Sequence, residues 1–130
     1  MRNGYDASLD PPAPILPIRV SAPGSEDSVL LYALVDTGAD LSVLPEGLVL
    51  EIGLPAVSRA QVCGFDRAFR SVMLHAATLE IAGRTTICEV LAFGDDALIG
   101  RDLLNRHAIL LDGPRQFLEL KESEKRRPGR

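Results

Sequence analysis

The sequence predicts an all-β protein with a closed or sandwiched sheet and one or two short helices. Short apolar runs alternate with Gly, Pro, Asp and Ser along most of the chain, and only 5% of the residues are aromatic. Apolar runs of roughly four to eight residues bounded by such turn residues indicate strands. Many short strands joined by tight turns are typical of β-barrels and β-sandwiches.

The first half of the chain contains two predicted strands and one predicted helix. Residues 15–20 form an apolar run that includes Pro17, which favours an edge position because proline lacks a backbone N–H. Residues 29–35 form an almost unbroken apolar run, which predicts a buried strand. A helix is expected to begin at Pro45 and to end at Gly53, because proline favours the first helical turn and glycine the C-terminus.

The remaining elements predict a chain built mainly of hairpins. The three predicted hairpins are residues 61–74 around Cys63–Arg67, residues 78–93 around Ala82–Arg84, and residues 109–120 around Gly113-Pro114. A short strand is expected at residues 41–44, and a second short helix at residues 101–107. Glycine at the centre of each hairpin supports these assignments, because glycine readily adopts turn conformations.

The predicted folded body is residues 15–120, between a flexible proline-rich leader at 1–14 and a basic, disordered tail at 121–130. Residues 1–120 carry nine Arg against sixteen Asp and Glu, whereas the tail carries five Lys and Arg against two Glu. An acidic body argues against nucleic acid as a partner. The chain has no signal-peptide pattern and no apolar run near the ~20 residues of a membrane span. We therefore expect no membrane partner and a cytoplasmic location.

Asp36 is the candidate catalytic residue, because its carboxylate directly follows the apolar run of residues 29–35. Such a placement is costly unless nearby groups compensate. The hydroxyl of Thr37 can hydrogen-bond to the backbone and hold a tight loop, and Gly38 allows close backbone approach. A carboxylate at the tip of a fixed loop suits acid–base catalysis. The alternative interpretation of this residue is an ordinary turn-forming Asp after a strand.

Two segments resemble one known family. Residues Ala33–Leu44, which contain Asp36-Thr37-Gly38, resemble the active-site segment of retropepsins, the retroviral-type aspartic proteases and their cellular and bacterial relatives. Residues Ala97–Leu104 resemble the apolar-apolar-Gly-Arg segment that precedes the helix of the same family. The resemblance covers nearly the whole predicted body. It implies a retropepsin-like closed β-fold with a flap hairpin between the two segments.

The resemblance also implies a role for each matching residue. Asp36 would be the catalytic carboxylate, and Thr37 and Gly38 would complete the active-site loop. The residues that would contact substrate are Leu34, Gly38, Asp40, Val43, Gly64, Phe65 and Leu98. Asp40 would in addition form a structural ion pair with Arg101. The predicted flap departs from the glycine-rich retroviral flap, because Gly64 is its only glycine.

The single Asp-Thr-Gly in the chain implies a homodimer. One carboxylate cannot both activate a water and donate a proton, whereas two facing carboxylates share a proton because both cannot ionise at close range. A two-fold axis brings the same loop in twice. The resemblance therefore implies an aspartic-type endopeptidase that acts on peptide or protein substrates and needs no metal or other cofactor.

Two alternative functions stay open. The chain could be a non-catalytic module that keeps the fold to bind peptides or to dimerise, although a binding module has no need of an ionisable Asp36. It could also be a processing domain of a longer polyprotein, which the Met start and the leader oppose. Metal or nucleophilic catalysis is not predicted, because neither His75 nor His107 has a metal-ligand companion at helical spacing, neither cysteine neighbours a histidine, and no Gly-x-Ser-x-Gly motif occurs.

Overall fold

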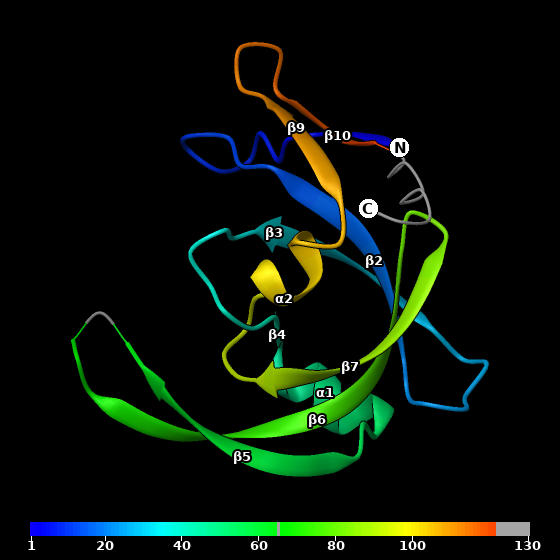
Figure 1. The fold of residues 1–130 in the computed structure, drawn as a ribbon, viewed down its shortest axis with the longest axis vertical. Helices are drawn as coiled ribbons and strands as arrows, with labels where there is room; N and C mark the ends of the chain where they lie inside the picture. Colours follow the sequence, from blue (N-terminus) through cyan, green and yellow to red (C-terminus); the bar gives the residue numbers. More distant parts are fainter. Residues whose placement is uncertain (65, 122–130) are drawn as a thin grey trace, which may run out of the picture.

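The computed structural model describes residues 1–64 and 66–121, which form two sheets and two short helices (Figure 1). The strands are β1 (Arg2–Gly4), β2 (Ile15–Ser21), β3 (Val29–Val35), β4 (Val43–Leu44), β5 (Ala56–Cys63), β6 (Phe69–Ile81), β7 (Arg84–Ala92), β8 (Leu98–Ile99), β9 (Ala108–Asp112) and β10 (Phe117–Lys121), and the helices are α1 (Glu46–Ile52) and α2 (Arg101–Leu104). The larger sheet has the order β2-β3-β8-β4-β7-β6-β5, and the smaller one β1-β10-β9. Strand β2 also pairs with β6, so the larger sheet closes on itself.

The long strand β6 joins the closed part of the sheet to a projecting hairpin (Figure 1). Its first half pairs with β5, from Cys63 opposite Phe69 onward, and its second half pairs with β7. The turn between β6 and β7 consists of Ala82 and Gly83, whose φ angles of 51° and 78° are both positive. Two consecutive positive φ angles define the turn type that matches the twist of a hairpin. The antiparallel pairs β5–β6, β6–β7 and β9–β10 confirm the three predicted hairpins.

The hydrophobic core fills the closed part of the larger sheet. Buried side chains alternate along β2 and along the second half of β6, as expected for strands with one face inside. The fully buried large side chains of the main cluster are Leu16, Ile18, Val20, Leu44, Val49, Leu79, Val90, Ile99 and Leu118. A smaller cluster of Val72, Leu74 and Leu91 joins β6 to β7, and partly buried side chains of β4 and β5 pack against it. This smaller cluster supports the projecting hairpin.

Both predicted helices are present, and one is shorter than expected. Helix α1 follows Pro45 and ends at Gly53, which adopts the left-handed conformation with φ 71°. Helix α2 ends at Leu104, because the next turn is tightened by bonds from Arg106 N to Leu103 O (3.1 Å) and from His107 N to Leu104 O (3.1 Å). No helix within the described parts of the chain has the length and hydropathy to span a membrane.

The N-terminal segment differs from the flexible leader that the sequence predicts. Strand β1 pairs antiparallel with β10, with Arg2 opposite Glu119 and Gly4 opposite Phe117. Tyr5 packs against the main core, and the guanidinium of Arg2 lies over the Phe117 ring, 4.2 Å from its centroid. The expectation was wrong for this part of the leader because pairing with a distant strand overrides the local turn-rich composition. The predicted tail, apart from Lys121, lies outside the described residues.

Strand β3 is less buried than its apolar sequence predicts. Only Ala33 is fully buried, whereas Leu30 is 45% exposed and Tyr32 is 58% exposed. Successive side chains of a strand point to opposite faces, so one face of β3 packs on the core and the other is largely uncovered. The prediction of a buried strand is therefore corrected for one face of β3. An apolar run shows the composition of both faces, but not whether each face packs against another element.

Candidate active site

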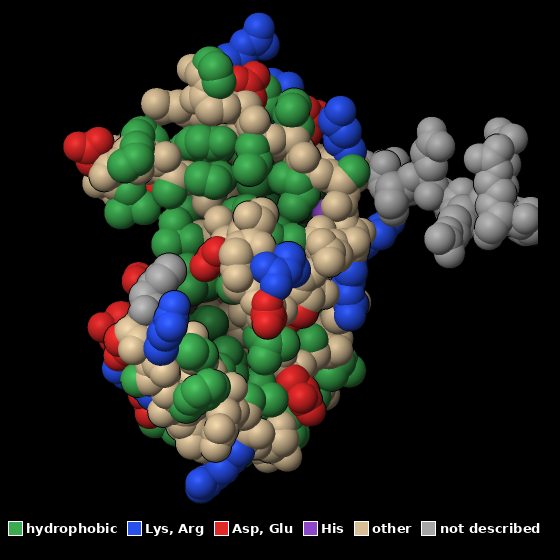
Figure 2. Space-filling model, turned by 60° about the vertical axis from the view of Figure 1, so that its left-hand side comes forward, with side chains coloured by type: hydrophobic (Ala, Val, Ile, Leu, Met, Phe, Trp, Pro, Cys, Tyr) green, Lys and Arg blue, Asp and Glu red, His purple; other side chains and the backbone are tan. Residues whose placement is uncertain are grey.

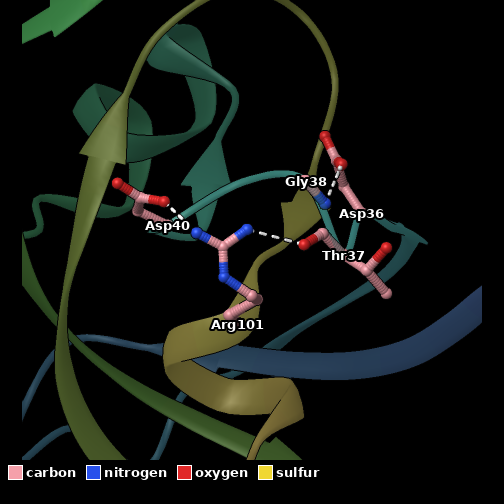
Figure 3. A network of polar contacts seen from close by, with 5 residues as sticks. All are labelled: Asp36, Thr37, Gly38, Asp40 and Arg101. Carbon is pink, nitrogen blue, oxygen red and sulfur yellow. Dashed lines mark hydrogen bonds and ion pairs between the residues drawn. The ribbon is translucent and has the colours of Figure 1, made fainter.

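Asp36 lies where the chain leaves the sheet at the end of β3. Strands β3 and β8 are parallel, with Val35 opposite Ile99, and the Asp36 N–H donates to Ile99 O at 3.0 Å. The Asp36 carboxylate accepts a hydrogen bond from the Gly38 N–H, 3.0 Å from Oδ1 (Figure 3). This side-chain-to-backbone bond is the local interaction by which Asp residues stabilise tight turns. The carboxylate is thus held in place while the residue stays partly exposed.

Arg101, the first residue of α2, braces the loop that follows Asp36. Its Nη1 donates to Thr37 O at 2.7 Å, its Nη2 forms an ion pair with Asp40, and its backbone N–H donates to Ala39 O at 2.9 Å (Figure 3). The Asp40 side chain is 84% exposed, so the ion pair adds little to stability. Its main effect is geometric: one planar guanidinium fixes two points of the same loop.

A buried polar network holds the two sequence segments together behind the loop. Ser42 is completely buried, and its Oγ donates to Asp102 Oδ1 at 2.8 Å, while its backbone N–H donates to Asp102 Oδ2 at 3.1 Å. The Gly100 N–H donates to Ser42 Oγ at 3.0 Å. The hydroxyl of Ser42 therefore acts as donor and acceptor at once, which satisfies the groups that meet there. Sequence reasoning missed the roles of Ser42 and Asp102, although Ser42 lies within the first recognised segment and Asp102 within the second.

A groove separates this loop from the hairpin of β5 and β6. One cavity of about 350 Å³ is lined by the loop residues Gly38, Asp40 and Val43 and by Val62 and Leu91, among others. An adjacent cavity of about 380 Å³ shares Val62 and continues toward the hairpin tip. Figure 2 brings forward the side of the molecule that carries the loop and the hairpin. The groove combines apolar side chains with Asp40 in the first cavity and Asp66 in the second. Ligand sites are usually mainly apolar with a few polar groups.

The structure places the predicted substrate-contacting residues in three groups. Gly38, Asp40 and Val43 line the first cavity, and Gly64 lines the second. Leu34 and Leu98 lie opposite each other in the β3–β8 pair, next to Asp36, and neither lines these two cavities. Phe65 lies outside the described residues.

Seven further residues line the first cavity and were not predicted: Ala39, Leu41, Ala60, Gln61, Val62, Cys63 and Leu91. Ala60 and Val62 alternate with the exposed residues Arg59 and Gln61 along β5. This alternation marks one covered face of the strand and could have identified them from the sequence.

The described residues contain no metal centre, and Cys88 is unsuited to act as a nucleophile. No group of three or more His, Cys, Asp or Glu side chains there is arranged to hold a metal ion. Burial, and secondarily the charge of Asp102, raise the pKa of Cys88 to about 11, although Arg106 acts in the opposite direction. The thiolate is the nucleophilic form of cysteine, so a raised pKa makes Cys88 a poor nucleophile.

Several solved structures have a similar fold. The EIAV protease bound to the inhibitor HBY-793 has a TM-score of 0.57 at 21% identity, over 72% of this chain and 86% of that one. A retropepsin-like aspartic protease from Rickettsia conorii has a TM-score of 0.58 at 16% identity, over 91% of this chain and 86% of that one. No family model and no curated protein matches the chain.

A third similar structure is the foamy viral protease-reverse transcriptase in complex with an RNA/DNA hybrid. Its TM-score is 0.58 at 18% identity, over 86% of this chain and 13% of that longer one. The likeness to this structure and to the two proteases shows that the protein has the retropepsin-like fold. The all-β prediction from the sequence is thereby confirmed.

Proposed function

We propose that the protein is an aspartic endopeptidase that works as a homodimer, with Asp36 of each chain forming one half of the catalytic pair. The observation that carries the proposal is the position of the Asp36 carboxylate. It lies at the end of a core strand, accepts a hydrogen bond from Gly38, and belongs to a loop that Arg101 braces at Thr37 and Asp40. The retropepsin-like fold supports the same conclusion.

The proposed chemistry needs two carboxylates in different protonation states. Two facing Asp36 carboxylates would share one proton, because like charges at close range cannot both ionise. The ionised carboxylate would take a proton from a water that attacks the scissile carbonyl carbon. The protonated carboxylate would donate its proton to the carbonyl oxygen, which gives a tetrahedral diol. Collapse of the diol would break the C–N bond, and the carboxyl group that took the proton from water would give it to the leaving amine nitrogen. Asp40 is a poor candidate for the second carboxylate, because it is already paired with Arg101.

Two exposed features support pairing of two chains. The Thr37 hydroxyl lies on the side of the loop away from Arg101, where a partner could reach it (Figure 3). Strand β9 is an edge strand with Leu110 39% and Leu111 45% exposed. On the side of the molecule drawn in Figure 2, hydrophobic side chains gather in the upper part, above a group of charged side chains. Exposed apolar area of this kind marks interaction surfaces.

The groove favours apolar substrate side chains. Val43, Val62 and Leu91 line its first cavity, and Leu34 and Leu98 lie next to Asp36. Burial of apolar area in such pockets contributes about 25 cal/mol per Å². We therefore propose that the protein cuts peptides between large apolar residues.

Digestion of a peptide library tests this function. We expect cleavage with apolar residues on both sides of the bond and a bell-shaped pH profile with an acidic optimum, because one carboxylate must be ionised and the other protonated. The Asp36→Asn protein should be inactive, since Asn is nearly isosteric but cannot accept the proton. Asp95→Asn, in an exposed turn, is the matched control and should keep full activity. Equal cleavage by the parent and Asp36→Asn proteins would refute the proposal.

A further inference from the structure

Another cavity lies between β6, β7 and the end of α2, outside the candidate active site. Its volume is about 330 Å³, near the lower end of the range of about 300–1,000 Å³ that is typical of small-molecule sites. Its floor consists of Leu79, Ile81 and Leu103, which are 1%, 4% and 3% exposed. The floor is therefore part of the rigid main core, and its shape does not depend on a mobile loop.

The rim of this cavity is made of basic and hydroxyl side chains. In the β6–β7 pair Arg84 is opposite Ile81 and Thr86 is opposite Leu79, so both project from the same face as the floor. Arg106, just after α2, reaches across the cavity, and its Nη1 donates to Thr86 Oγ1 at 3.3 Å. The two arginines thus reach the same rim from elements far apart in sequence.

The charged side chains among the described residues that line the rim are basic. His107 also lines the cavity, and its pKa is lowered by burial first and then by the charges of Arg84 and Arg106. The described residues that line the cavity include no carboxylate. Asp102 of α2 is already bonded to Ser42.

We propose that this cavity binds a small anion that has a short apolar body, such as a short-chain carboxylate or an organic phosphate. Arg106 would bind the oxyanion, because guanidinium groups form strong, paired hydrogen bonds with carboxylate and phosphate oxygens. Arg84 lines the same rim. His107 would add a donor at the rim. The apolar body would lie on the floor, where it would be removed from water. Binding of such an anion in this cavity would not require the protein to be a protease.

Histidine NMR gives a direct test, because the chain has two histidines. His107 lines the cavity, whereas His75 is buried elsewhere with Nδ1 2.8 Å from Leu54 O, so His75 is an internal control. The full chain, labelled at histidine, would be titrated with hexanoate and with phenyl phosphate at constant ionic strength and pH. We expect a saturable shift of the His107 signals and none of the His75 signals. Comparison of the two probes distinguishes a carboxylate ligand from a phosphate ligand.

Variants of the rim and probes without an apolar body test whether the anion binds in this cavity. Arg106→Gln should weaken binding at least ten-fold, and Thr86→Val, which removes the hydroxyl that positions Arg106, should weaken it less. Arg115→Gln, in the exposed β9–β10 turn, is the matched control and should bind like the parent. Acetate and inorganic phosphate, which lack the apolar body, should bind more weakly than hexanoate and phenyl phosphate. The proposal is overturned if neither probe shifts His107 saturably, if both histidines shift alike, or if acetate binds as tightly as hexanoate.

Discussion

The backbone of Gly100 lies against the backbone of Leu41, with no room for a side chain between them. A Cβ at position 100 would be 2.8 Å from both the carbonyl carbon and the carbonyl oxygen of Leu41, and 2.9 Å from Ala39 O. The obstacles are backbone atoms of the loop that carries Asp36, so they cannot rotate away as a side chain would. Glycine is needed here for space, and this close approach is what brings the two recognised sequence segments into contact.

Gly100→Ala should therefore destabilise the protein and displace the loop of Asp36. An added methyl group in a packed site typically costs about 1–3 kcal/mol, and we expect a loss in this range in urea unfolding. Gly47→Ala is the matched control, because Gly47 lies in α1 with open space around it. That change should be neutral or stabilising by up to about 1 kcal/mol, since alanine favours helix. Equal stability of Gly100→Ala and the parent would contradict the observed contact.

Ser42→Ala should also destabilise the protein, because it removes two hydrogen bonds at a buried position. The substitution removes the donor to Asp102 Oδ1 and the acceptor for the Gly100 N–H in a completely buried position. Leaving a buried polar group without a partner costs about 1–3 kcal/mol, and more for a charged group. Asp102 Oδ1 keeps its hydrogen bond from the Leu103 N–H, so urea unfolding should show a loss within this range.

Ser71→Ala is the control for Ser42→Ala, because Ser71 is exposed on β6. It should change the free energy of unfolding by no more than about 0.5 kcal/mol. A Ser42→Ala protein as stable as Ser71→Ala would mean that the Ser42–Asp102 network does not hold the loop.

Much of the fold could be predicted from local patterns, and the buried network could not. The helix between Pro45 and Gly53 and the turn at Ala82 and Gly83 depend on neighbouring residues, so the sequence shows them directly. Ser42 and Asp102 are 60 residues apart. Each is a polar residue that alone suggests a surface position. Only the crossing of the two segments brings buried Ser42 into contact with partly buried Asp102.

The candidate site also combines local features, which the sequence indicates, with features that depend on the fold. The position of Asp36 after an apolar strand is a local feature, and the sequence indicates it. The groove is not local, because Val62 on β5 and Leu91 on β7 meet only through the pairing of both strands with β6. Strand β1 was missed for the same reason, since its pairing partner β10 lies at the other end of the described chain.

The two cysteines should differ in reactivity toward an alkylating reagent. The pKa of Cys88 is raised to about 11, mainly by burial, so at pH 8 only about one thiol in a thousand is the reactive thiolate. Cys63 is exposed in the hairpin and should be alkylated first. Mass spectrometry after short labelling at pH 8 should find one modification, on Cys63. Modification of Cys88 at the same rate would contradict its burial.

The raised pKa of Cys88 also predicts how stability depends on pH. The unfolded thiol, with a pKa near 9.0, loses its proton before the folded one does. The folded state therefore binds more protons between pH 9 and about 11, and stability from this group is full below pH 9 and lost as pH rises toward 11. Cys88→Ala should remove this part of the alkaline loss, so the stability difference between parent and variant should shrink over this range. A difference that stays constant would show that Cys88 ionises normally.

Subunit mixing tests the proposed homodimer most directly. One chain supplies one Asp36, so a pair of parent and Asp36→Asn chains would contain a single ionisable aspartate at the catalytic position. With a roughly nine-fold excess of Asp36→Asn chains and free exchange, only about one parent chain in ten would pair with another parent chain. We therefore expect the activity per parent chain to fall to about one-tenth, as measured by peptide cleavage after the mixture has equilibrated. Adding the same excess of a protein unable to pair with it, such as serum albumin, should leave the activity unchanged. If each chain carried a complete site, the Asp36→Asn chains would have no effect either, and the shared-site mechanism would have to be abandoned.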